Sequence, residues 1–238
     1  MKKWGTILTR LGNEFSILLV NEFTKYVRNE ISLEVARDTV RRELDKISER
    51  MRFGSYTSTE EVCEAIFMTH DPIYRTYYRC PDNHQQLYSQ SYTILLNRGR
   101  SPFKSTAEWM QTNSQRGSNR CETCDKSVNI DVSFIIPPPL VILEVSGSES
   151  EIDIDNSFEV AHLGQPHKYD LAGVVYYKDA DRHFVSNIVM PDKQLWYYDS
   201  MSNGGHMSCL GPLAMHHPVT RCRGGSACVA FYVISSCK

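Results

Sequence analysis

The chain lacks long apolar runs, an export signal and an excess of either charge. A membrane-spanning helix needs about 20 consecutive apolar residues, and no segment of the 238 residues reaches that length. Polar residues such as Thr6 and Arg10 interrupt the apolar core that a secretory signal would need. The net charge of −2, from 26 basic and 28 acidic side chains, gives no global attraction to nucleic acid or anionic membranes. We therefore expect a protein without nucleic-acid or membrane partners.

The composition is that of an ordinary globular protein, with 41% hydrophobic and 23% charged residues. A length of 238 residues fits one large domain, and we expect a monomer in the cytoplasm or nucleus. Without an export signal, the eight cysteines are better explained as thiols or metal ligands than as a disulfide framework.

The first part of the chain, to about Tyr78, has a helical pattern. Apolar residues recur every three or four positions from Leu33 to Met51. Ser58 and Glu61 have the spacing of a capping box, which predicts a second helix that ends before Pro72. Cys63 lies in the first turns of that helix, where the dipole could activate a thiol, but it also fits the buried stripe, which is the interpretation we favour.

The rest of the chain is predicted to be irregular and then β-rich. The polar segment 97–119 is typical of an irregular connection, and its basic run of residues 97–104 is typical of a solvated loop. Three prolines at 137–139 should precede a buried strand from Leu140 to Leu143, because proline cannot donate to a β-ladder. The acidic segment 146–157 is predicted to be a solvated turn. Helices followed by strands indicate an α+β fold.

Three predicted strands, 169–177, 182–189 and 195–200, carry the most chemical information. His183 begins the second strand and Asp199 ends the third, so adjacent antiparallel pairing would bring them within hydrogen-bond reach. We expect Trp196 and Tyr198 to pack beneath them. A carboxylate beside an imidazole is the base and orienting group of a nucleophilic triad. The alternative is a histidine at a strand edge and an unrelated aspartate in a turn.

Two ligand pairs, Cys80-x3-His84 and Cys121-x2-Cys124, predict a tetrahedral zinc site. Four protein ligands would make this zinc structural rather than catalytic. The alternative is a set of unrelated surface residues. A second metal site is the alternative for a group near the C-terminus, but only His206 and Cys209 have compact ligand spacing. We interpret the group as a loop with scattered thiols and a core Cys228: His206, Cys209, His216, His217, Cys222, Cys228 and Cys237.

These residues resemble the C-terminal half of the ubiquitin-specific proteases, which are papain-like deubiquitinases. That family has a Y-x-L-x-G-V strand, then a catalytic His followed by an aromatic residue, then a Trp before an aromatic–Asp pair. The corresponding residues here are Tyr169, Leu171, Gly173, Val174, His183, Phe184, Trp196, Tyr198 and Asp199. Segments 138–143 and 227–232 are similar to two further strands of the family, and the two ligand pairs match its zinc-ribbon fingers. The resemblance covers roughly residues 33 to 233.

The resemblance implies a papain-like fold of the ubiquitin-specific protease type in a single domain. Residues 1–78 would form a helical partial thumb, 79–131 fingers with a zinc ribbon, and 132–238 an antiparallel β palm. The implied activity is thiol-dependent isopeptidase cleavage after ubiquitin or a ubiquitin-like modifier. In that reaction His183 would be the general base and Asp199 would hold the imidazole.

The chain departs from the family at several positions. Arg182 stands where the family usually has Gly, and the His-Phe form is similar to divergent branches, including the SUMO-directed one. In the family, an N-x-G-N-x-C box carries the nucleophile. Residues 11–16 are only weakly similar to this box, with Phe15 or Ser16 in place of Cys. We therefore expect a truncated domain or a pseudoenzyme, inactive as written. The alternatives are a catalytically dead ubiquitin- or SUMO-binding module, a SUMO-directed isopeptidase and a zinc-stabilised structural domain.

Overall fold

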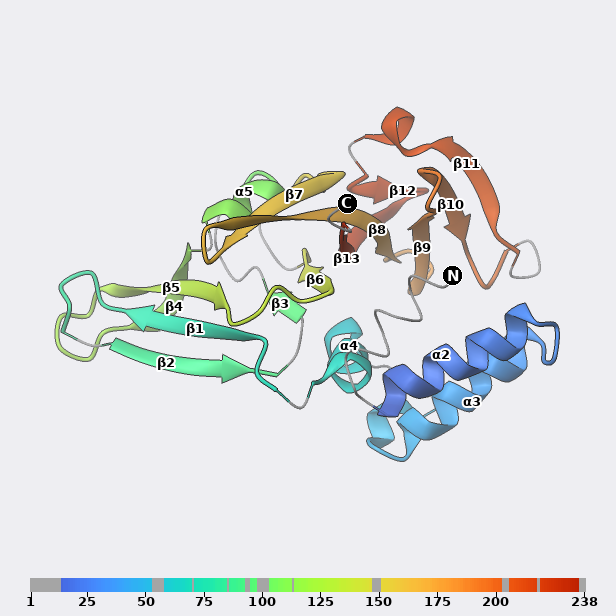
Figure 1. Cartoon of the computed structure of the whole chain (residues 1–238), viewed down its shortest axis with the longest axis horizontal. Coiled ribbons are helices and arrows are strands. Elements are labelled where there is room, and N and C mark those ends of the chain that lie inside the picture. The colour runs from blue at the N-terminus through green and yellow to red at the C-terminus, as the bar shows by residue number, and fades with distance from the viewer. Residues whose placement is uncertain are drawn as a thin grey trace. The chain divides into compact units, whose positions relative to one another are not determined.

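The structure is a computed structural model that describes residues 14–52, 58–69, 71–84, 86–92, 95–97, 103–112, 114–146, 151–202, 206–217 and 219–235. It is a mixed α/β protein with antiparallel sheets (Figure 1). The chain forms two compact units. We call Met1–Ile73 with Tyr92–Leu95 the helical unit, and Tyr74–Ser91 with Leu96–Lys238 the sheet unit. Within the described ranges, no helix combines the length and apolar character needed to cross a membrane.

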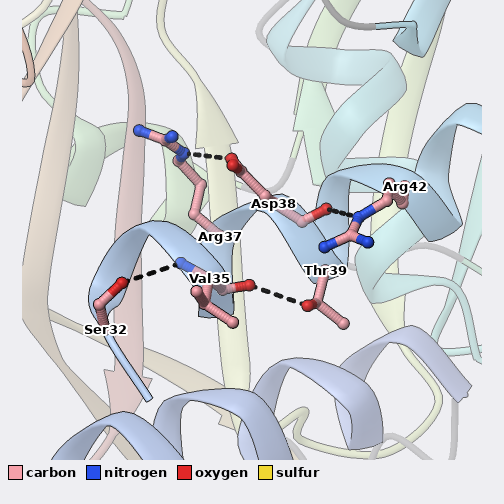
Figure 2. A network of polar contacts seen from close by, with 6 residues as sticks. All are labelled: Ser32, Val35, Arg37, Asp38, Thr39 and Arg42. Atoms are coloured by element: carbon pink, nitrogen blue, oxygen red, sulfur yellow. Dashed lines mark hydrogen bonds and ion pairs between the residues drawn. The ribbon is translucent and has the colours of Figure 1, made fainter.

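The described elements of the helical unit are α2 (Glu14–Val27), α3 (Leu33–Asp45), the 3₁₀ turn η1 (Glu49–Met51) and α4 (Thr59–Phe67). Ser32 caps the N-terminus of helix α3: its hydroxyl accepts a hydrogen bond from the Val35 N–H (Figure 2). Its outer face carries the Arg37–Asp38 ion pair at 2.9 Å (Figure 2). Charged residues on one face and Ala36, Val40 and Leu44 buried on the other confirm the predicted amphipathic helix, although it ends at Asp45.

Helix α4 confirms the predicted capping box. The Ser58 hydroxyl accepts from the Glu61 N–H at 3.1 Å, and the Glu61 carboxylate accepts from the Ser58 N–H at 3.3 Å. Cys63 is only 4% exposed, as the apolar stripe predicts. Ser16 of α2 is fully buried and donates to the Ile66 carbonyl at 2.6 Å. Its hydroxyl therefore ties α2 to α4.

The described strands form two antiparallel sheets (Figure 1). The four-stranded sheet has the order β2-β1-β5-β4. Its strands are β1 (Tyr74–Arg79), β2 (Gln86–Ser91), β4 (Ser114–Arg120) and β5 (Ser127–Phe134). The nine-stranded sheet has the order β11-β10-β9-β8-β13-β6-β3, with β12 beside β13 and β7 beside β8. Its strands are β3 (Leu95–Asn97), β6 (Leu140–Glu144), β7 (Ser157–His162), β8 (Gln165–Lys178), β9 (His183–Val189), β10 (Gln194–Tyr198), β11 (Ser208–Pro212), β12 (Arg221–Cys222) and β13 (Gly225–Ile234).

The nine-stranded sheet has a continuous core where β6, β13 and β8 pair side by side. Residues 140–143 of β6 are at most 1% exposed, which is why this strand lacks polar alternation. Tyr169, Tyr176 and Tyr232 are fully buried, and each hydroxyl finds a partner. This rigid core supports β8, and β8 in turn sets the register of β9.

Three sequence-based expectations were wrong. Residues 74–79 form a strand rather than the end of a helical region. Helix α5 (Thr106–Thr112) lies in the segment predicted to be irregular; Ser105 and Asp155 cap it, and Trp109 and Met110 bury its apolar side. The predicted solvated turn contains Ile152 and Ile154, which are 3% and 0% exposed. Burial against distant elements overrode a locally polar composition in both of the last two cases.

Candidate functional site

His183 and Asp199 lie together on one face of the nine-stranded sheet. His183 is the first residue of β9 and is opposite Lys178 of β8, while Asp199 directly follows β10. The His183 Nε2 atom lies 2.8 Å from Asp199 Oδ1. The side chains are 15% and 9% exposed. The predicted proximity is found; the catalytic role of the two residues stays a prediction.

Asp199 is held as a carboxylate by three donors. Oδ1 accepts from His183 and from the Met201 N–H at 2.9 Å, and Oδ2 accepts from the Tyr197 hydroxyl at 3.0 Å. Burial pushes the pKa of Asp199 upward, but the hydrogen bonds from Met201, His183 and Tyr197 outweigh it and lower the pKa to about 2. The group is therefore charged at neutral pH.

The charged carboxylate fixes the tautomer of His183. A carboxylate can only accept hydrogen bonds, so Nε2 must carry the proton that bridges to Asp199. This leaves the Nδ1 lone pair as the basic position of the ring. No described residue hydrogen-bonds to Nδ1. The pair can thus accept a proton at Nδ1 while Asp199 stabilises the imidazolium that forms.

The turn before His183 carries backbone strain. Arg182 has φ 50°, in the left-handed region that glycine adopts freely and other residues adopt at a cost of roughly 1–2 kcal/mol. This conformation gives a physical reason for a glycine at this position in the family that the chain resembles. Arg182 is exposed, so its side chain has room despite the strained backbone.

The expectation that Trp196 and Tyr198 pack beneath His183 and Asp199 was wrong. Tyr197 lies on the His183 face and is 3% exposed, whereas Trp196 and Tyr198 alternate to the other face and are half-buried. The strict alternation of side chains along a strand, applied to the interval ending at Asp199, would have selected Tyr197. Arg223 was missed as well: its guanidinium carbon lies 4.0 Å from the centroid of the Tyr197 ring. No local sequence signal links these two residues.

The second constellation lies at one end of the four-stranded sheet. Cys80 and His84 flank the turn between β1 and β2, and Cys121 and Cys124 lie in the turn between β4 and β5. Because β1 pairs with β5, both turns meet at the same end. The ligand atoms of the four residues all lie within 4.8 Å of one another. These residues could hold a metal ion.

The donor set fits a tetrahedral zinc site. The sulfurs of Cys80 and Cys124 are 3.4 Å apart, and Cys80 Sγ is 3.9 Å from His84 Nδ1. Zn–S bonds of about 2.3 Å in a tetrahedron place two sulfurs about 3.8 Å apart. The N–H groups of Cys124 and Thr123 lower the pKa of Cys121 to about 6. The Lys126 N–H lowers the pKa of Cys124, but burial and the neighbouring thiols outweigh this hydrogen bond. The pKa of Cys124 is therefore raised to about 11. A bound cation would relieve the repulsion between neighbouring thiolates.

The remaining cysteines and histidines do not form a second site among the described residues. Cys222 donates to Asn187 Oδ1 at 3.5 Å, and Cys228 donates to the Val175 carbonyl at 3.2 Å. Cys209 is exposed on β11 and pairs in register with Trp196, so it lies on the face opposite His183. Cys228 is buried in the sheet as predicted, whereas Cys209 and Cys222 lie on β11 and β12 rather than in the predicted loop. Cys237 lies outside the described residues.

No protein-family model and no curated protein matches the chain. Among solved structures, the SAGA Ubp8/Sgf11/Sus1/Sgf73 DUB module bound to ubiquitin aldehyde matches at 11% identity over 85% of this chain, with a TM-score of 0.49. A yeast SAGA DUB module with mutant Sgf73 matches at 12% identity over 77% of this chain, with a TM-score of 0.47. The chain spans 50% and 47% of those two chains.

Proposed function

We propose that this chain is a ubiquitin-specific-protease-like domain that binds ubiquitin or a ubiquitin-like modifier and, as written, performs no covalent catalysis. The observation that carries the proposal is the His183–Asp199 contact. It engages Nε2 and leaves Nδ1 open, at the positions where the chain resembles the family. The order of strands around the pair, β8 to β9 to β10, is the order of the motifs that carry the resemblance.

The pair has the parts of a thiol-activating base. In such a hydrolase the base takes the proton of a thiol, and the thiolate then attacks the carbonyl carbon of the scissile bond. Here the proton would move to Nδ1 of His183, while Nε2–H keeps its bond to Asp199. Asp199 would remain ionised throughout, because its pKa of about 2 lies far below neutral pH.

The described thiols outside the Cys80–His84–Cys121–Cys124 cluster, and the Ser16 hydroxyl, are not suited to be the nucleophile; exposed Cys209 lies on the face opposite His183. Cys63 is 4% exposed, and Cys222 and Cys228 are buried and donate to other oxygens. Ser16, in the segment weakly similar to the family's nucleophile box, is fully buried and donates to the Ile66 carbonyl. A buried group cannot reach a protein substrate. We therefore propose a domain that keeps the base and its orienting carboxylate but binds rather than cleaves.

Tail-directed probes and binding measurements test this proposal together. The chain is incubated with electrophilic ubiquitin and SUMO probes, and non-covalent binding of both modifiers is followed by NMR. We expect no covalent adduct, and saturable binding of one modifier. An adduct would overturn the inactive state, and His183→Ala should then abolish it. Binding of neither modifier, without an adduct, would reject the function and favour a zinc-stabilised domain of unrelated role.

We also infer that Cys80, His84, Cys121 and Cys124 hold one structural zinc. Support comes from the ligand spacing and from the convergence of four ligand atoms within 4.8 Å. Zinc would supply no step of a hydrolysis at His183. It would replace thiol protons and hold the two turns of the four-stranded sheet together.

A further inference from the structure

The segment from Val219 to Arg223 is fixed to the face of the sheet that carries His183. The Tyr176 hydroxyl donates to the Val219 carbonyl at 2.8 Å, and Asn187 Nδ2 donates to the same hydroxyl at 3.1 Å. Asn187 Oδ1 accepts from the buried Cys222 thiol. These bonds form a continuous chain in which each buried group has a partner. The segment therefore has a defined position against β8 and β9.

The turn that follows directs Arg223 onto Tyr197. Arg223 has φ 45° and Gly224 φ 83°, so both adopt left-handed conformations. At Gly225, a Cβ atom would lie 3.1 Å from side-chain atoms of Tyr176 and Lys178, so glycine lets the hairpin pack this close to β8. A strained non-glycine residue persists only where its surroundings determine it. Arg223 is itself exposed but covers the ring of Tyr197, which is 3% exposed.

We propose that Tyr197 and Arg223 are positioning residues for the His183–Asp199 pair: Arg223 holds the Tyr197 ring, and the Tyr197 hydroxyl sets the plane of the Asp199 carboxylate. This inference rests on the proposed function for its biological meaning. The terminal torsion of an aspartate is broad and soft, so one contact does not fix which oxygen faces a partner. Tyr197 on Oδ2, together with the Met201 N–H on Oδ1, fixes the carboxylate so that Oδ1 faces His183 Nε2.

A cation over the ring also strengthens the hydroxyl as a donor. Burial raises the pKa of Tyr197, and the bond to Asp199 raises it further, while the charge of Arg223 opposes both. The other charged and titratable groups facing Asp199 are His183, Lys178 with its partner Asp181, and Cys222 near Tyr197. Among the described side chains, Tyr197 and His183 are the ones that hydrogen-bond to the Asp199 carboxylate. Removing the Tyr197 hydroxyl should therefore change the pKa of Asp199.

Tyr197→Phe tests the inference, with Tyr198→Phe as the matched control on the opposite face. Carbon-13 NMR of the Asp199 carboxyl gives its pKa, and nitrogen-15 shifts of the His183 ring give the tautomer. We expect Tyr197→Phe to raise the Asp199 pKa by about one unit and to lower the fraction of Nε2–H tautomer. Tyr198→Phe should change neither. Equal behaviour of the two variants would overturn the inference.

Arg223 variants provide a second and independent test that leaves every group hydrogen-bonded to Asp199 in place. Arg223→Ala uncovers the Tyr197 ring, and we expect about half the Asp199 shift of Tyr197→Phe; Arg223→Lys keeps the charge and should give less. If the tautomer is unchanged in Arg223→Ala, Arg223 has no positioning role. If Tyr197→Phe does not fold, this result by itself overturns the inference. None of these measurements needs a modifier. A chain that binds neither ubiquitin nor SUMO but shows these shifts would reject the proposed function and keep the positioning role.

Discussion

The four-stranded sheet and the nine-stranded sheet each bring polar groups together at strand ends, but by different physical means. In the first, Cys80–His84 and Cys121–Cys124 are close in sequence, and each pair belongs to one tight turn. In the second, His183 and Asp199 belong to different strands and meet through the pairing of β9 with β10. Each half of the first cluster depends on one local turn, and the pairing of β1 with β5 joins the two halves; both residues of the second cluster depend on strand register.

The two clusters also differ in how their charge is satisfied. Asp199 has three donors and is complete without any added group. Backbone N–H groups lower the pKa of Cys121 to about 6, while burial and the neighbouring thiols raise the pKa of Cys124 to about 11, so the two thiols do not ionise together. A metal would resolve this competition, while the His183–Asp199 pair needs none. The comparison predicts that the two sheets respond independently to metal and to acid.

Loss of the metal should produce the largest effect. Cys121→Ser with Cys124→Ser should reduce bound zinc from one per chain to none and lower the hydrogen-exchange protection of β1 and β5. Structural zinc contributes on the order of 10 kcal/mol to folding in small zinc domains. Elemental analysis and hydrogen exchange check this, with Cys209→Ser as the control. The NMR signals of His183 should stay unchanged; a purified wild-type chain without zinc would contradict the prediction.

Removal of the carboxylate should have the next largest effect, confined to the nine-stranded sheet. Asp199→Ala leaves the His183, Tyr197 and Met201 donors without their acceptor. We expect it to lower the free energy of unfolding by about 2–3 kcal/mol, measured by urea denaturation. Zinc content should not change. A loss below about 0.5 kcal/mol would show that these contacts contribute little.

The same carboxylate predicts a defined acid sensitivity. Its pKa falls from the ordinary 3.8 to about 2 on folding, so the folded chain binds this proton less readily than the unfolded chain. Its stabilisation is therefore complete above pH 3.8 and is lost as the pH falls toward about 2. Asp199→Asn should remove this part of the pH dependence. The free energy of unfolding is measured against pH with and without Asp199→Asn, both in the metal-free Cys121→Ser, Cys124→Ser background, because acid also releases zinc. Parallel stability–pH curves would contradict the prediction.

The turns that present the two clusters should show the smallest effect. Arg182 has φ 50° before His183, and Asn83 has φ 58° between Cys80 and His84. Asparagine tolerates this region and arginine does not. We expect Arg182→Gly to raise the free energy of unfolding by roughly 0.5–1 kcal/mol and Asn83→Gly to change it little. Thermal or urea unfolding of both variants measures the difference, and equal effects would argue against strain at Arg182.

The strands around His183 and Asp199 could be predicted because their pattern is local. Apolar runs, alternation and turn residues delimit 169–177, 182–189 and 195–200, and the structure has β8, β9 and β10 there. The capping box at Ser58 and the two ligand pairs were likewise visible as spacings. Helix α5 also had a local signal, the Ser105-x-x-Glu108 spacing, but the polar composition around it pointed to a loop.

The sequence by itself determined where turns, caps and ligand pairs lie, since these depend on residues within a few positions of each other. Tertiary structure alone decided that Ile152 and Ile154 are buried and that Arg223 covers Tyr197. The physical reason is that strand register and hairpin docking bring together residues 26 positions apart (223 − 197). The free energy that selects one register comes from burial of the whole sheet, and no local pattern of residues contains it.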